Sequence, residues 1–113
     1  MKHACLILFL ITALGVLASR TRGGPVSAEA GSATQLYSKN CASCHGRDGR
    51  AKTFKAKLNH ARNISDSEWQ ERVSDERIFN SIMNGKGKMP AYGKKLSEQE
   101  IEALVTYVRG LKK

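Results

Sequence analysis

Apolar side chains recur every three or four positions in the second half of the chain, which is the spacing of an amphipathic helix. The first such pattern follows Ser74, a favourable N-cap residue, and runs to Gly85. The second follows Ser97 and Glu100, which match the capping-box motif, and runs to the C-terminus. We therefore predict one helix between Ser74 and Gly85 and a terminal helix after Ser97.

Weaker patterns predict the rest of a helical fold. Residues 33–41 are compatible with a helix, and residues 55–59 with one short turn inside a basic loop. Ser65 and Glu68 match a second capping box, which predicts a short helix carrying Trp69. No segment shows alternating apolar residues flanked by hairpin turns. The predicted fold class is all-α, with about four helices and one long glycine-rich loop.

The N-terminus carries a candidate export signal, because Lys2 is followed by an apolar run over residues 4–18. This run has the length of a signal-peptide core and falls short of the about 20 apolar residues that span a bilayer. Several small residues suit cleavage, and we favour the site after Ala28. We expect residues 1–28 to be a cleaved signal peptide and residues 29–113 to form one domain, without a permanent membrane anchor.

The expected mature chain is small and basic. Loss of Lys2, Arg20 and Arg22 with the leader lowers the formal net charge from +9 to +6. The remaining basic residues are dispersed along the chain, a pattern that argues against a nucleic-acid-binding arm. Such a surface favours docking to acidic protein partners. Because about 85 residues bury only a modest core, we expect a further component to complete it.

Cys41, Cys44 and His45 carry the clearest chemical signature. Cys5 lies in the leader, and the loop between the other two cysteines is too short for a disulfide to add much stability. Spacings of three and four residues place all three side chains on one face of a helical turn. Cys-x-x-Cys-His is the attachment signature of c-type haem. Its thiols form thioethers with the haem vinyl groups, while the imidazole reaches the iron.

Two other uses of the cysteine pair are weaker. A zinc site needs four ligands, and the mature chain offers only His45 and His60 beside the two cysteines. A thioredoxin-like redox pair calls for a βαβ pattern around the cysteines, which is absent. Two idle, neighbouring thiols would be unusual in an oxidising compartment. We favour one covalent haem c, held by Cys41 and Cys44, with His45 as the proximal iron ligand.

Met89 is the preferred candidate for the distal iron ligand. It lies in the segment 85–93, whose glycines permit a tight loop, and Pro90 biases Met89 toward extended geometry. A thioether favours ferrous iron, and His/Met ligation raises the haem potential. Filling both axial positions leaves no vacancy for oxygen or peroxide, which indicates an electron carrier and not an enzyme.

Met83, His60 and an open position remain alternatives for the distal side. Met83 lies on the apolar stripe of its helix, where a methionine usually fills the core. His60 has Asn59 and Ala61 as neighbours, and its environment suits an ordinary surface histidine. Trp69 fits equally well against a haem or in the core.

The chain resembles the class I c-type cytochromes over essentially its whole expected mature length. The resemblance rests on Leu36 and Tyr37, residues 41–46, residues 84–92 and the terminal helix. It is strongest toward small bacterial cytochromes, including those of photosynthetic electron transport. It implies an all-helical shell wrapped around a single haem.

The resemblance also implies specific packing. The first and last helices of the family cross closely, which would bring Ala33 and Tyr37 against Leu104 and Tyr107. A haem would complete the core, and little stable structure is expected without it. The candidate apolar walls for the haem are Leu36, Phe54, Leu58, Trp69, Ile78, Ile82, Leu96 and Leu104.

The expected function is one-electron transfer between redox partners outside the cytoplasm, in the periplasm or alternatively in the thylakoid lumen. The haem edge near Cys41 and Cys44 is the expected docking surface, with Lys39, Lys86 and Lys88 as candidate steering charges. Two rival functions stay open. One is a peroxidase or gas-reactive haem enzyme with a labile distal ligand, and the other is a haem subunit held in a dehydrogenase or oxidase complex instead of a free monomer.

Overall fold

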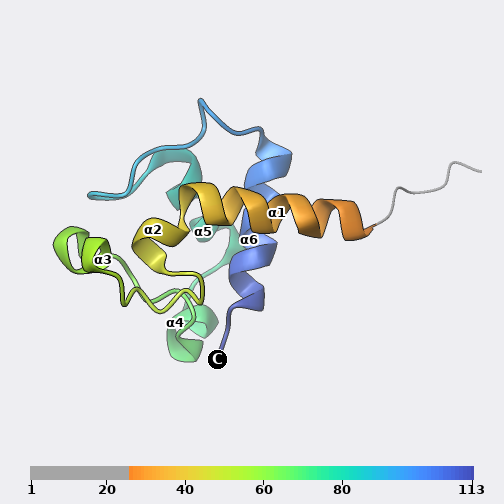
Figure 1. Cartoon of the computed structure of the whole chain (residues 1–113). Coiled ribbons are helices and arrows are strands. Elements are labelled where there is room, and N and C mark those ends of the chain that lie inside the picture. Colours follow the sequence, from red (N-terminus) through yellow and green to blue (C-terminus); the bar gives the residue numbers. More distant parts are fainter. Residues whose placement is uncertain (1–25) are drawn as a thin grey trace, which may run out of the picture.

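The computed structural model describes residues 26–113, with side chains from residue 32 onward (Figure 1). Within these residues the structure is helical and has no β-strand. The predicted all-α fold class is therefore confirmed. The helices outnumber the expected four, and three of them have only four to six residues. They are α1 (Val26–Asn40), α2 (Ala42–His45), α3 (Phe54–Asn59), α4 (Ser67–Arg72), α5 (Asp75–Asn84) and α6 (Glu98–Gly110).

Two of the predicted helix starts are confirmed by their caps. The Ser74 side chain accepts a hydrogen bond from the Arg77 N–H at the start of α5. At the start of α6, the Ser97 hydroxyl accepts from the Glu100 N–H at 3.2 Å, and the Glu100 carboxylate accepts from the Ser97 N–H at 2.8 Å. Both caps satisfy backbone donors that a helix N-terminus leaves without partners.

The predicted capping box at Ser65 and Glu68 is wrong by one residue. The N-cap of α4 is Asp66, whose Oδ1 accepts from the Trp69 N–H at 2.8 Å. Ser65 is instead buried, and its hydroxyl donates to Asn63 Oδ1 at 2.8 Å. The motif was ambiguous because Ser and Asp are about equally good N-cap residues, and burial decided between them.

Helices α1 and α6 cross at the centre of the molecule (Figure 1). Ala33 and Tyr37 are buried on α1, and the ring of Tyr37 lies 4.7 Å from the ring of Tyr107 between their centroids. The Tyr37 hydroxyl donates to the Gly46 carbonyl at 2.7 Å, and burial raises the pKa of this phenol. The predicted crossing of the first and last helices is confirmed. The hydrogen bond from Tyr37 also links α1 to Gly46, directly after α2.

A single apolar core surrounds this crossing. It joins α1, α5 and α6 to the loop that precedes α4, so it links most of the described chain. Burial of such a cluster is the main favourable term in folding. Its buried members are Tyr37, Ile64, Ile78, Ile82, Ile101, Leu104, Val105 and Val108.

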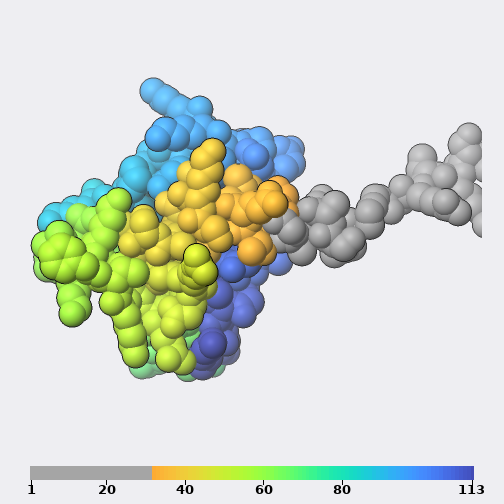
Figure 2. Space-filling model, in the orientation of Figure 1, coloured from red at the N-terminus to blue at the C-terminus, as the bar shows by residue number. Residues whose placement is uncertain are grey.

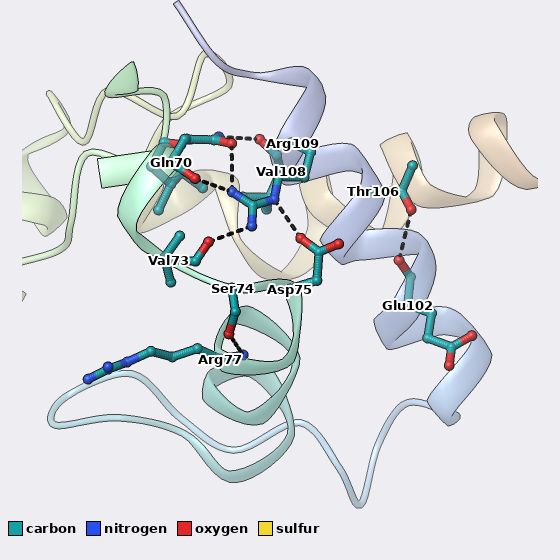
Figure 3. A network of polar contacts seen from close by, with 10 residues as sticks. Gln70, Val73, Ser74, Asp75, Arg77, Glu102, Thr106, Val108 and Arg109 are labelled. Carbon is teal, nitrogen blue, oxygen red and sulfur yellow. Dashed lines mark hydrogen bonds and ion pairs between the residues drawn. The ribbon is translucent and has the colours of Figure 1, made fainter. Parts of the chain in front are cut away.

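A polar network around Arg109 joins α6 to the end of α4 and the start of α5 (Figure 3). The Arg109 guanidinium donates to the carbonyls of Gln70 and Val73 at the end of α4 and to Asp75 Oδ1 at 2.6 Å. The buried Gln70 amide donates to the Val108 carbonyl at 2.7 Å. These bonds satisfy terminal carbonyls of α4 and fix the turn between α4 and α5 against α6.

Substitution Arg109→Met should lower the free energy of unfolding of the haem-loaded protein by about 2–3 kcal/mol, because hydrogen bonds from a charged donor are lost and the Gln70 and Val73 carbonyls keep no donor. The matched control is Arg72→Met, which removes an exposed pair with Glu68 and should cost about 0.5 kcal/mol or less. Urea unfolding of both variants measures the difference. Equal effects would contradict a structural role for the Arg109 network.

The predicted signal peptide lies almost entirely outside the described residues. Residues 1–25 are not described, and residues 26–28 fall in the first turn of α1. The cleavage site after Ala28 therefore stays a prediction. Among the described residues, no helix combines the length and the apolar character needed to cross a membrane.

Candidate functional site

The two cysteines and the histidine lie on a helical turn that continues α1 into α2. The Cys41 N–H donates to the Tyr37 carbonyl at 2.8 Å, and the His45 N–H donates to the Cys41 carbonyl at 2.9 Å. Cys41 itself has helical dihedral angles, so the helical periodicity is kept through the junction. Cys41, Cys44 and His45 consequently line one cavity, as their spacing predicted.

The His45 ring is held by one hydrogen bond. Its Nδ1 lies 2.9 Å from the Arg62 carbonyl oxygen, which can only accept. Nδ1 therefore carries the proton, and the lone pair of Nε2 is left free on a ring of fixed orientation. This is the arrangement that a neutral imidazole needs to ligate a metal, with the second nitrogen donating to a backbone carbonyl.

The two thiols have different surroundings. Burial, and secondarily the neighbouring Cys44, raises the pKa of the Cys41 thiol to about 11. Before haem attachment Cys41 is therefore protonated at neutral pH and is a weak nucleophile. The Cys44 sulfur accepts a long hydrogen bond from the Asn59 side-chain amide, with 3.9 Å between Nδ2 and Sγ. Cys41 and Cys44 form no disulfide with each other.

The cavity beside this turn has a volume of about 530 Å³. That volume lies within the roughly 300–1,000 Å³ usual for sites that bind small organic molecules. Apolar side chains from α1, α4, α5 and α6 form its walls, so a mostly apolar molecule suits it. The apolar residues and tyrosines that line it are Tyr37, Ile64, Trp69, Val73, Ile78, Ile82, Met89, Tyr92, Leu104 and Val108.

Four of the eight predicted haem-wall residues line the cavity. Trp69 lines the cavity and also packs against the core, so both of its proposed roles apply. Ile78, Ile82 and Leu104 line it as well. The prediction is wrong for four residues: Leu36 and Leu96 pack against the core outside the cavity, and Phe54 and Leu58 are exposed.

Sequence reasoning also missed several wall residues. Val108 lies four positions after Leu104, so the helical spacing of α6 could have placed it on the same wall. Tyr37 was expected only at the helix crossing. Ile64 and Tyr92 come from irregular segments, where no periodicity indicates which way a side chain points.

Met89 enters the same cavity from the loop that follows α5. The loop turns back on itself, because the Lys86 and Met89 backbones exchange two hydrogen bonds of 3.1 and 3.0 Å. Two further bonds anchor it: the Tyr92 N–H donates to the Ile82 carbonyl, and the Tyr92 hydroxyl donates to the Asn40 carbonyl at 2.8 Å. Met89 is thus held between α1 and α5.

Neither alternative residue has the same placement as Met89. Met83 does not line the cavity, and its sulfur lies against the backbone of Gly93. His60 does line the cavity, but it is solvent-exposed and ends α3 as its C-cap with a left-handed φ of 53°. The geometry therefore favours Met89, while the iron ligand itself stays a proposal.

Glycines 85 and 87 make unequal contributions to this loop. Gly85 has φ +75°, and a Cβ there would lie 2.7 Å from the Met89 carbonyl oxygen. We expect Gly85→Ala to lower the free energy of unfolding by about 3 kcal/mol and to displace Met89. Gly87→Ala is the control, because a Cβ added at Gly87 would have no atom within 4 Å. Its φ of +59° is the remaining source of strain, so a loss of only about 1 kcal/mol is expected.

Denaturant unfolding and the ferric absorption spectrum test this pair of glycine variants. Gly85→Ala should weaken the red-region band of sulfur-bound iron, and Gly87→Ala should keep it. Equal stability losses in the two variants would contradict the close packing of Gly85 against the Met89 backbone.

The described part of the chain offers no separate cluster of metal-binding side chains. Residues 26–113 contain no group of three or more His, Cys, Asp or Glu side chains placed to hold a metal ion. A tetrahedral zinc site of the usual donors therefore has no support there.

Comparisons with known proteins agree with this geometry. Residues 28–108 match the family described as cytochrome c oxidase, cbb3-type, subunit III. The chain is 38% identical over 84 residues to cytochrome c6 of Gloeothece citriformis, covering 71% of this chain and 69% of that protein. It is 35% identical over 78 residues to the cbb3-type oxidase subunit FixP of Azorhizobium caulinodans, covering 68% of this chain but only 25% of that longer protein.

A solved structure agrees as well. The c-type cytochrome KustC0563 superposes with a TM-score of 0.66 at 41% identity, covering 72% of this chain and 98% of that one. The match therefore extends over nearly the whole of a solved c-type cytochrome. The chain therefore belongs to the class I c-type cytochromes and carries one covalently bound haem c with its iron.

Proposed function

We propose that this cytochrome carries single electrons between redox partners outside the cytoplasm. The observation that carries the proposal is that Cys41, Cys44, His45 and Met89 line one apolar cavity although they come from two separate segments. Haem supplies a ferric/ferrous couple when bound. The protein supplies the attachment, the two axial ligands and a dry environment.

Each of the four residues has a separate role in the proposal. Cys41 and Cys44 form the thioethers, and His45 ligates the iron through Nε2 because its Nδ1 donates to the Arg62 carbonyl. Met89 ligates the opposite side through its sulfur. Hydrogen bonds hold the His45 ring and the Met89 loop, so the ligands keep their positions when the charge on the iron changes. A small change in geometry is what rapid electron transfer requires.

We also propose that residues 1–28 are removed on export and that the mature protein works in the periplasm, with the thylakoid lumen as the alternative. Its partners are redox proteins with acidic docking faces. The whole chain has a formal net charge of +9, and only three of its basic residues lie in the leader. The remaining positive charge supports electrostatic attraction to such partners.

The haem-loaded mature protein should give one reversible one-electron wave and should bind neither carbon monoxide nor cyanide rapidly at neutral pH. Both axial positions are filled in the proposed carrier, so no position is open for an added ligand. Spectroelectrochemistry and rapid mixing measure these properties. Immediate carbon monoxide binding by the ferrous wild-type protein would instead support the rival haem enzyme.

The family match favours one second candidate, a haem subunit of an oxidase, because the matched family is named for such a subunit. The match to cytochromes c6 and to a solved c-type cytochrome, 98% of which is covered, supports a carrier. Size-exclusion chromatography of protein from its native source separates the two. A monomer supports the carrier, and a stable complex containing other redox subunits supports the alternative.

A further inference from the structure

Phe54 and Leu58 are the large apolar side chains that the described residues leave in solvent. Phe54 is 77% exposed and Leu58 is 55% exposed. They are four residues apart on α3, so they lie on the same side of the helix. Helix α3 lies at one edge of the molecule, in green in Figure 2. An exposed apolar pair at such a position is typical of a surface that binds another molecule.

The surroundings of this pair are strongly basic. Residues 49–65 contain five Lys and Arg residues and no Asp or Glu. Lys52, Lys55 and Lys57 flank the pair, are all exposed, and take part in none of the ion pairs of the described structure. We call Phe54, Leu58 and these three lysines the α3 face.

A second basic segment adjoins the α3 face. Residues 77–97 also contain five Lys and Arg residues and no acidic residue. Lys88 of this segment donates to the Leu58 carbonyl at 2.9 Å, which fixes the Met89 loop against α3. Lys88 was expected to be a steering charge, and its ammonium group also donates a hydrogen bond within the fold. The two segments together hold ten of the nineteen Lys and Arg residues and no acidic residue, while eight of the ten acidic residues lie within residues 66–76 and 98–102.

The α3 face is directly connected to the proposed haem attachment. The Thr53 hydroxyl caps α3 by accepting from the Ala56 N–H, and it lies 2.9 and 3.1 Å from the carbonyl oxygens of Ser43 and Cys44. At the other end of α3, Asn59 contacts the Cys44 sulfur. A partner seated on α3 would therefore lie beside Cys44, where the distance to the haem is short.

We infer that the α3 face docks an acidic redox protein, with Phe54 and Leu58 as the apolar centre and Lys52, Lys55 and Lys57 as the cationic rim. This inference rests on the proposed electron-carrier function and names the surface and the chemistry of its partner. Protein interfaces usually have an apolar centre enriched in aromatic residues and a polar, solvent-accessible rim. The charges raise the association rate, and burial of the apolar pair lowers the dissociation rate of the complex.

The charge of the α3 face selects among possible occupants. A second copy of this chain would bring like charges together around the apolar pair, which disfavours self-association. Helix α3 has only six residues, and its two apolar side chains present little area for insertion into a bilayer. An acidic protein surface would pair with the lysines, and the same contact would cover the apolar pair.

The first test uses a reduced acidic plant-type ferredoxin as the electron donor to the haem-loaded mature protein. The double variant Lys55→Gln/Lys57→Gln should lower the second-order rate about threefold to tenfold at low ionic strength, and the difference should disappear at high salt. Lys112→Gln/Lys113→Gln is the matched control, because it removes the same charge at the C-terminus. Equal losses in the two double variants would overturn the proposed rim.

The second test concerns the apolar pair. Phe54→Ser/Leu58→Ser should weaken ferredoxin binding about tenfold, and this loss should persist at high salt because it is not electrostatic. Phe54→Leu/Leu58→Met keeps the apolar area and should restore binding. The absorption spectrum and the melting temperature should stay unchanged, since both side chains are exposed. Unchanged binding of the double serine variant would overturn the proposal.

Two further outcomes would also overturn this inference while leaving the electron-carrier function intact. In the first, the double serine variant loses binding to anionic phosphatidylglycerol vesicles but keeps its ferredoxin rate, and α3 would then be a membrane contact. In the second, its visible spectrum changes, and the pair would then pack on the haem. Reduction by ascorbate tests the carrier function separately, because a small reductant needs no docking surface.

Discussion

Replacement of Met89 by alanine should remove the red-region sulfur-to-iron charge-transfer band from the ferric spectrum. The side chain that reaches the cavity from the loop after α5 is lost, and no other methionine of the described residues lines the cavity. The reduction potential should fall by on the order of 100 mV, because a thioether ligand stabilises ferrous iron. Changes of axial ligand shift haem reduction potentials over a range of about 0.8 V. The ferrous variant should also bind carbon monoxide rapidly. Absorption spectroscopy and spectroelectrochemistry measure these changes.

Met83→Leu is the matched control for this experiment. Met83 lies outside the cavity with its sulfur against Gly93, so the band and the potential should be kept. His60→Ala should likewise leave the spectrum unchanged, although His60 lines the cavity. A band that survives in Met89→Ala and disappears in Met83→Leu would move the ligand to Met83.

The double variant Cys41→Ala/Cys44→Ala, purified free of haem, should show no cooperative thermal transition. The wild-type chain encloses a cavity of about 530 Å³ among the same residues that form its core, including Ile78, Ile82 and Leu104. A chain of this size buries little apolar surface without a further component, and an unfilled cavity removes packing contacts from its walls. Circular dichroism during heating measures the transition.

Mass spectrometry completes the experiment on the cysteines. Wild-type protein made with haem-attachment machinery should carry one covalent haem, and the double variant should have the mass of the bare polypeptide. Cys41→Ala alone keeps one possible thioether at Cys44 and should retain part of the stability. A cooperatively melting, haem-free double variant would show that the polypeptide core suffices without the cofactor.

Local sequence signals predicted the elements that depend on neighbouring residues. The Ser74 cap and the capping box of Ser97 and Glu100 involve residues only three positions apart, so they are readable without the fold. The same reasoning placed the three residues of the Cys-x-x-Cys-His turn on one side of a helix. It failed at Ser65, because Asp66 is an equally good cap and the burial of Ser65 depends on distant contacts.

The candidate site was predictable in its chemistry but only partly in its walls. Phe54 and Leu58 were expected against a haem because they are apolar, and they are exposed because α3 turns its apolar side chains outward. Hydrophobicity alone does not say which surface an apolar side chain will meet. The Arg109 network also had no signal, since its partners lie 34 to 39 residues away in the sequence.

The amino-acid sequence by itself determined the helical fold class, the starts of α5 and α6, the attachment motif and Met89 as the preferred ligand, because each depends on residue type and short spacing. Only the tertiary structure decided that Tyr92, Asn40 and Lys88 hold the Met89 loop, and that Arg62 orients His45. It also decided that a basic, partly apolar face lies beside Cys44. Such contacts join residues far apart in the chain, and they exist only once the core has packed.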